Sequence, residues 1–409
     1  MASERTTRQV AGGQAGISPS SRPRAFWFVA YTFVIAMLGG TLPIPLYVIY
    51  QQMWGFSGGM LTVVFAVYAV GTLFALLLFG ELSDRIGRRR VLWAVLVLAA
   101  LSSVVFILAQ GVAWLLVARV ISGLSVGLCT GTAAAALNEL EPHSDNRRAA
   151  LFSTASNMGG LGLGALVAGL FAEYAPLPTI VVYVFFIVLL VPAAFGLLAT
   201  PETVKSQEGG LSLRPQRLRV PAGIRSAFAL LAAAVFCAFA LLGLFSSLVP
   251  SFLADQVQET NHAVAGAVVF LVFATAVAVQ LVLRGKVESH RAMGTGMVLL
   301  VVGLVLLLIG LSISSLVWFL IGTVCCGVGV GLSFMGSLAL LNGLAPPDHR
   351  GEVLSSYFAV AYVGLSVPVI GLGVTSGYVG AFEATLAFAV VIGVLALIVA
   401  ALNARSTPR

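Results

Sequence analysis

The chain has 409 residues and a formal net charge of +7, with only 9% charged residues against 59% hydrophobic residues. Soluble domains carry about 25% charged residues. The composition therefore excludes an ordinary soluble protein and indicates that a lipid bilayer surrounds much of the molecule.

The chain begins with a polar segment, residues 1–24, which lacks an apolar cleavable stretch and predicts a disordered tail rather than a signal peptide. A linker at 200–225 and a short tail at 403–409 are also polar. We expect two six-helix domains, 25–199 and 226–402. The predicted membrane-spanning segments are 25–50, 57–79, 91–109, 112–139, 149–175, 179–199, 226–253, 263–283, 293–313, 316–344, 353–374 and 384–402.

Lysine and arginine lie on one side of this arrangement. Of the 22 such residues, all except Arg119 fall in the tails, the linker or the loops after even-numbered segments. The positive-inside rule therefore predicts that both termini and the linker are cytoplasmic. We expect a multi-pass protein of the cell (plasma or inner) membrane.

The two halves repeat at an offset of about 204 residues. The matched pairs include Gly39 and Gly243, Trp114 and Trp318, Gly123 and Gly327, Gly127 and Gly331, Asn138 and Asn342, and Gly160 and Gly364. A parallel repeat predicts an all-α protein of two six-helix bundles, related by a pseudo-two-fold axis along the membrane normal.

Cysteine and histidine show no arrangement that binds metal. The four cysteines lie inside apolar segments, and the four histidines are scattered in loops. We expect no metal, no cofactor, no catalytic centre and no nucleic-acid partner.

A charged loop follows the second segment. It reads Gly-x-Leu-x-Asp-Arg-x-Gly-Arg-Arg, with Gly80, Leu82, Asp84, Arg85, Gly87, Arg88 and Arg89 at the specified positions. With the twelve segments and the repeat, this loop resembles the signature loop of the major facilitator superfamily, over essentially 25–402. The resemblance implies an alternating-access transporter.

The chemistry of this loop favours a gate. Gly80 allows close helix approach, while Asp84 can face a helix N-terminus or pair with an arginine. Arg88 or Arg89 can pair with Glu139 or Glu141. The resemblance implies that Asp84 meets the eleventh segment and locks the cytoplasmic side.

Alternatively, the arginines of the loop only anchor the topology. The corresponding stretch at 284–291 keeps charge and loses the pattern, so we expect an asymmetric gate.

Arg119 is the one charged residue well inside a segment, where charge is costly without a partner or a water-filled cavity. Helical spacing places it on one face with Gly123, Val126 and Thr130. Arg119 and Gly123 resemble a family motif whose arginine is linked to proton coupling or substrate contact. The alternative is a structural arginine bonded to backbone carbonyls.

The fifth segment is rich in small residues. Gly160, Gly164 and Gly169 predict close helix packing. Residues 164–169 resemble the family's antiporter motif, Gly-Pro-x-x-Gly-Gly. However, Ala165 replaces the proline and Ala168 replaces a glycine, which weakens the inference of proton exchange.

Several polar or aromatic residues in the segments are further candidates for substrate contact. Asn157 lies in the fifth segment and Ser246 in the seventh. Tyr47 follows two prolines near the outer end of the first segment, where it either lines the vestibule or, as we favour, joins the interfacial aromatic belt.

These patterns favour a monomeric carrier in the lipid bilayer that exports a hydrophobic or amphipathic, drug-like small molecule in exchange for protons. No carboxylate lies near a segment centre, which counts against proton coupling. One alternative is a facilitator or symporter for a sugar, amino acid or other metabolite. Another is a membrane enzyme or non-transporting receptor.

Overall fold

The computed structural model describes residues 22–80, 82–143, 145–204, 218–255, 257 and 259–406. Within these residues the structure is helical and contains twelve helices long and apolar enough to cross a membrane, as predicted. They are α2 (Arg22–Thr41), α4 (Gly58–Phe79), α6 (Arg88–Ile107), α7 (Val112–Leu140), α8 (Asn146–Tyr174), α9 (Pro178–Ala199), α10 (Arg225–Ser247), α12 (His262–Leu283), α13 (Ser289–Ser312), α14 (Leu316–Leu344), α15 (Arg350–Val379) and α16 (Ala381–Ser406).

The structure describes the expected tails and linker only in part. Of the expected tail at 1–24, residues 1–21 lie outside the described part of the chain. Helix α2 begins at Arg22, within the expected tail. The expected tail at 403–409 is helical as far as Ser406, and 407–409 lie outside the described part. Most of the expected linker, 205–217, also lies outside it.

The first and seventh segments are shorter than predicted, and each is followed by a separate short helix. Pro43 and Pro45 follow the end of α2, and the chain turns before α3 (Tyr47–Trp54). Pro250 lies at the start of α11 (Val249–Asp255), just after α10. Proline lacks the backbone N–H that would continue a helix, which explains both breaks.

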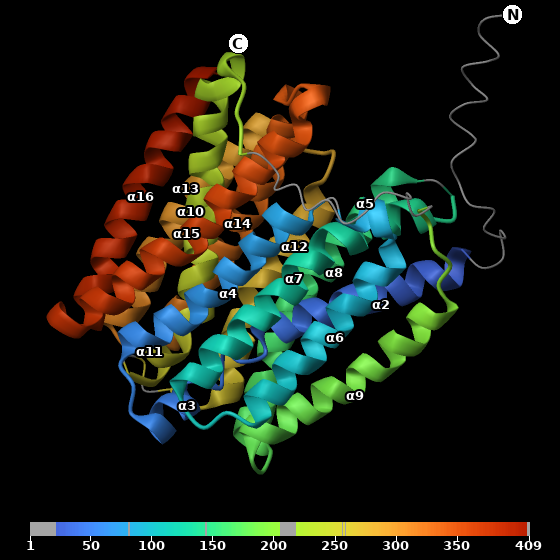
Figure 1. The fold of residues 1–409 in the computed structure, drawn as a ribbon. Helices are drawn as coiled ribbons and strands as arrows, with labels where there is room; N and C mark the ends of the chain where they lie inside the picture. The colour runs from blue at the N-terminus through green and yellow to red at the C-terminus, as the bar shows by residue number, and fades with distance from the viewer. Residues whose placement is uncertain are drawn as a thin grey trace, which may run out of the picture.

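The helices form two bundles, α2 to α9 and α10 to α16, which repeat the same packing (Figure 1). Gly127 of α7 packs against the Thr72 carbonyl of α4, and Gly331 of α14 packs against the Ala276 carbonyl of α12. All four positions are related by the predicted offset of 204. A side chain at either glycine would collide with the neighbouring backbone, so these glycines set the helix separation.

The bundle has two chemically different ends. We call the end that carries α5 (Leu82–Ile86) and the first residues of α6 the basic side, and the opposite end, with α3 and α11, the far side (Figure 1). In the described part of the chain, every lysine and arginine except Arg119 belongs to the basic side.

The two bundles meet most closely near the far side. Gly373 of α15 packs on Thr62 of α4, and Gly169 of α8 packs on Gly266 of α12. The Glu173 carboxylate also accepts a hydrogen bond from the His262 backbone N–H at 2.9 Å. These contacts close the far side in this conformation.

Candidate functional site

A cavity of about 180 Å³ lies between the two bundles. Helices α2, α4, α7 and α8 form one wall, and α10, α12, α14 and α15 form the other. Its lining side chains are Gly40, Thr41, Phe65, Tyr68, Leu76, Thr130, Ser153, Thr154, Asn157, Met158, Leu161, Phe239, Leu242, Ser246, Phe273, Phe334, Phe358, Tyr362 and Leu365.

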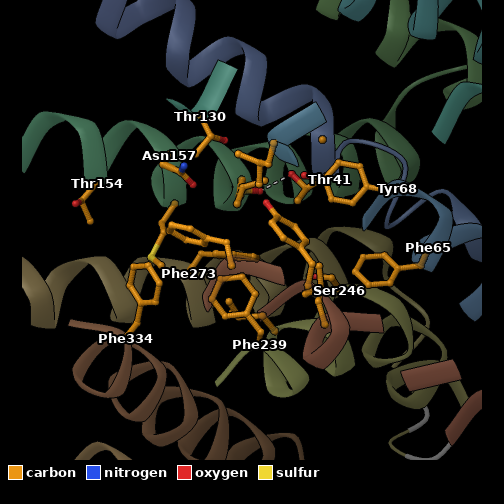
Figure 2. A pocket seen from close by; sticks show the side chains of 18 of the residues that line it. Thr41, Phe65, Tyr68, Thr130, Thr154, Asn157, Phe239, Ser246, Phe273 and Phe334 are labelled. Atoms are coloured by element: carbon orange, nitrogen blue, oxygen red, sulfur yellow. Dashed lines mark hydrogen bonds between the residues drawn. The ribbon is translucent and has the colours of Figure 1, made fainter. Parts of the chain in front are cut away.

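The two walls differ in polarity (Figure 2). Most of the polar groups come from the first bundle, including Ser153, Thr154 and Asn157 on one face of α8. The second bundle contributes Phe239, Phe273, Phe334, Phe358 and Tyr362. The cavity is therefore amphipathic, with a polar edge facing a set of aromatic rings.

The polar groups of the cavity are of two kinds: some are already bonded to the protein, and others are free to bind a solute. The Thr130 hydroxyl donates to the Val126 carbonyl at 2.8 Å, and Thr41 donates to Leu161. Among the described residues, the side chains of Ser153, Thr154, Asn157 and Ser246 make no hydrogen bond to protein. Thr130, Asn157 and Ser246, all singled out from the sequence, thus lie in the cavity wall.

Access to the cavity differs between the two sides. A second cavity, of about 430 Å³, lies towards the basic side and shares Thr154 and Phe334 with the central one. A third, of about 820 Å³ at the far side, shares no lining residue with it. The central cavity therefore adjoins the basic side and is separated from the far side.

The charged loop forms a polar cluster on the basic side. The Arg88 guanidinium lies 3.0 Å from the Glu139 carboxylate of α7 and 2.5 Å from that of Asp84. It also donates to the Ser83 hydroxyl at 2.6 Å. Of the pairings expected for Arg88 or Arg89 with Glu139 or Glu141, that of Arg88 with Glu139 is present, and it fastens the start of α6 to the end of α7.

Glu202 also belongs to this cluster, and the sequence did not predict its participation. Its carboxylate accepts the backbone N–H groups of Arg88 at 2.7 Å and Arg89 at 3.2 Å. Gly87 has a φ of 107°, and a side chain there would collide with Glu202. The sequence offers one signal for this contact, the acidic residue Glu202 shortly after the end of α9. Its partners, Arg88 and Arg89, lie far away in the chain, so the sequence does not show that they meet.

The expected contact between Asp84 and the eleventh segment is not made in this conformation. The Asp84 side chain is 56% exposed and pairs with Arg88, four residues later. Gly80 directly follows α4 and is exposed, and Arg85 lies in α5. Because the far side is closed here, a lock on the basic side is not required.

Arg119, for which the resemblance implies proton coupling or substrate contact, does not line the cavity. It is fully buried, and its Nη1 donates to the Gly40 carbonyl at 2.7 Å. Its Cζ lies 4.3 Å from the Tyr68 ring centroid and 5.7 Å from that of Phe65. Arg119 therefore lies directly behind three residues of the wall.

Two further residues are placed differently from expectation. Gly123 packs against the Tyr68 carbonyl of α4 and serves helix packing rather than the cavity wall. Tyr47 is 1% exposed, with its ring 5.9 Å from Arg119 Cζ, so it does not belong to an interfacial belt.

The small residues of α8 pack against two neighbours. Gly160 and Gly164 lie on the backbone of α2, at the Val34 and Leu38 carbonyls, and Gly169 lies on α12. The helix packing expected from these glycines is therefore present, and Gly169 contributes to the contact between bundles.

Comparison with known proteins decides the family. The sequence model of the Major Facilitator Superfamily matches residues 29–367 and 231–409. The chain belongs to the Major Facilitator Superfamily. It is therefore a transporter rather than an enzyme, built as a multi-pass membrane protein.

Curated relatives match this superfamily member over short stretches. The arabinose-proton symporter of Bacillus subtilis is 32% identical over 92 residues, which are 22% of this chain and 20% of the relative. The quinolone resistance protein NorA of Staphylococcus aureus is 25% identical over 147 residues, 36% of this chain and 38% of NorA. The matches thus span well under half of these relatives.

Solved structures of the superfamily share the whole fold. A bacterial homologue of the human lysosomal transporter Spinster, inward-facing and unoccupied, has a TM-score of 0.73 at 14% identity and covers 95% of this chain and 97% of its own. A D-xylose-proton symporter gives 0.73 at 16%, covering 96% and 98%. The human organic anion transporter MFSD10 gives 0.68 at 16%, covering 92% and 99%.

Glu141, at the end of α7, differs chemically from its neighbour Glu139. Desolvation would raise the pKa of Glu141, but the backbone N–H groups of Asp145 and His143 and the side chains of His143 and Arg148 lower it, and the net shift is downward. Its side chain is 1% exposed, with its carboxylate 3.6 Å from Arg148. Glu141 is thus a structural anion of this superfamily member.

Proposed function

We propose that this protein is an alternating-access carrier of the cell membrane, which exports a hydrophobic or amphipathic small molecule in exchange for protons and acts as a monomer. The central cavity between the bundles carries this proposal. With the basic side in the cytoplasm, as the positive-inside rule predicts, the far side is closed and the cavity adjoins the cytoplasmic face.

The chemistry of the cavity supports an amphipathic solute. Its aromatic wall offers stacking surfaces, whereas Ser153, Thr154, Asn157 and Ser246 can bind a small number of polar groups. Export is supported by the similarity to NorA, a quinolone resistance protein.

Proton exchange would have to use groups outside the cavity. No acidic side chain lines the cavity in the described part of the chain. Asp84 and Glu139, which share Arg88 on the basic side, are the candidates to carry the proton.

A sugar carrier is a second candidate, supported by the match to the arabinose-proton symporter. A sugar presents many hydroxyl groups, and each needs a hydrogen-bond partner when it leaves water. The few free polar groups of this cavity favour the amphipathic solute.

The test is flux of a neutral aromatic dye into proteoliposomes. We compare Phe239→Ala, in the cavity, with Phe195→Ala on α9, whose side chain is 66% exposed on the outer surface. Loss of a stacked ring should raise KM by roughly 5- to 10-fold, while Phe195→Ala should transport like the wild type. Equal transport by both variants would contradict the cavity as the binding site.

The driving force is tested in the same vesicles, with acid inside and a dye that does not titrate. Antiport predicts accumulation above the equilibrium level as protons leave. Uptake to the same level with and without the pH gradient would indicate a facilitator.

A further inference from the structure

The central cavity is bordered by a buried positive charge. Arg119 contacts three residues of its wall: it donates to the Gly40 carbonyl and lies against the rings of Phe65 and Tyr68. A guanidinium stays ionised in proteins. Its charge is therefore present just behind the surface that a bound solute touches.

Among the described residues, this charge has no counter-ion. The Nε and Nη2 atoms of Arg119 are buried and have no hydrogen-bond partner, and no carboxylate pairs with Arg119 in the described part of the chain. The side chains lining the cavity there are all uncharged. Among the described residues, Arg119 therefore places a positive charge beside the cavity with no carboxylate next to it.

Aromatic rings alone would make the opposite prediction. A cavity lined by many rings attracts cations through cation–π contacts. Here, Tyr68 and Phe65 already have the Arg119 guanidinium close to their rings, at 4.3 Å and 5.7 Å from the centroids. A cationic solute on the cavity side of these rings would face a like charge across them.

We propose that Arg119 makes the cavity select against positive charge, so that the transported solute is an aromatic compound that is neutral or anionic. This rests on the proposed function and narrows its substrate class. For unit charges about 10 Å apart at an effective dielectric constant of about 20, Coulomb's law gives an effect on the order of tenfold per unit charge.

The test uses three anthracene derivatives of similar shape: 9-anthracenemethanol (neutral), 9-anthracenecarboxylate (anionic) and 9-anthracenylmethyl-trimethylammonium (cationic). Binding to the full chain in nanodiscs is followed by anthracene fluorescence. We expect the alcohol and the carboxylate to bind, and the ammonium compound to bind at least tenfold more weakly than the carboxylate.

Two variants separate charge from packing. Arg119→Gln keeps a polar, hydrogen-bonding side chain and removes the charge, so the three affinities should converge to within about threefold. A merely structural role would instead weaken all three affinities equally. Should Arg119→Gln fail to fold, Asn157→Asp adds a carboxylate to the cavity wall and should shift the preference towards the ammonium compound.

Two results overturn the proposal: ammonium binding to the wild type as tight as carboxylate binding, or an unchanged ratio in the variants. Failure of the proposed function looks different, because then none of the three compounds binds to the protein or crosses the proteoliposome membrane faster than it crosses protein-free vesicles.

Discussion

Glu139 and Glu141 are two residues apart, yet their surroundings suit them to different tasks. Glu139 is partly exposed and shares Arg88 with Asp84, whereas Glu141 is buried against Arg148 and two backbone N–H groups. A group that exchanges protons near neutral pH cannot be held as a permanent anion. Glu141 therefore does not suit proton exchange, and Glu139 stays the candidate of the two under the proposed function.

The low pKa of Glu141 predicts how it responds to pH. The Glu141 anion stabilises the turn after α7 at any pH above the ordinary pKa of a glutamate side chain. This contribution is lost only as the pH falls through the lowered pKa of the folded state. We expect the Glu141→Gln variant to show the same pH dependence of transport as the wild type over roughly pH 5.5 to 8. Flux across that range measures this, with Glu139→Gln as the comparison that should flatten the profile. A flattened profile in Glu141→Gln would contradict our assignment.

At the scale of elements, α6 is held at its first turn by a residue from the linker. The Glu202 carboxylate occupies the N-terminus of α6, where backbone N–H groups lack helical partners and the helix dipole is positive. The repeat-related helix α13 begins differently, because Glu288 at its N-cap makes no side-chain capping bond and pairs with Arg291 at 3.4 Å. The two halves therefore share packing but differ at their basic side, as the lost pattern at 284–291 predicts.

This difference predicts unequal effects of the same substitution. Glu202→Gln should destabilise the protein by about 1 kcal/mol, because a neutral amide caps the helix less well. Glu288→Gln, the matched control, should have little effect because its ion pair is exposed. Thermal unfolding in detergent distinguishes them, and equal melting temperatures for the two variants would argue against the role of Glu202.

At the scale of the whole molecule, transport by alternating access requires the far side to open. There, α4 meets α15: a side-chain carbon at Gly59 would lie 3.7 Å from the Val374 Cα. This spacing suits a disulfide between introduced cysteines. The four native cysteines are free, and Cys129, Cys237 and Cys326 are buried.

We expect the double variant Gly59→Cys with Val374→Cys to lose transport on oxidation and to regain it on reduction. The cross-link would hold the bundles closed at the far side, so the solute could not be released there. The two single-cysteine variants under the same oxidant serve as controls. Full transport by the cross-linked protein would exclude opening of this contact during the cycle.

Part of this protein follows from its sequence alone. The spans, the repeat and an ion pair of Arg88 or Arg89 with Glu139 or Glu141 were predictable, because span length, charge placement and repeated spacing are local properties that a bilayer turns directly into structure. Even the N-caps of α4 and α12, Ser57 and Asn261, obey the offset of 204. Thr130, Asn157 and Ser246 stood out because polar side chains are scarce in apolar segments.

Only the tertiary structure decided the remainder. Phe239 and Phe273 line the cavity while Phe195 faces outward, yet in sequence all three are phenylalanines in apolar helices. Without water around the spans, hydrophobicity does not distinguish a lipid-facing ring from a cavity-lining one. For the same reason, the place of Arg119 behind Tyr68 emerged only once α2, α4 and α7 were packed together, since it depends on contacts between residues far apart in the chain.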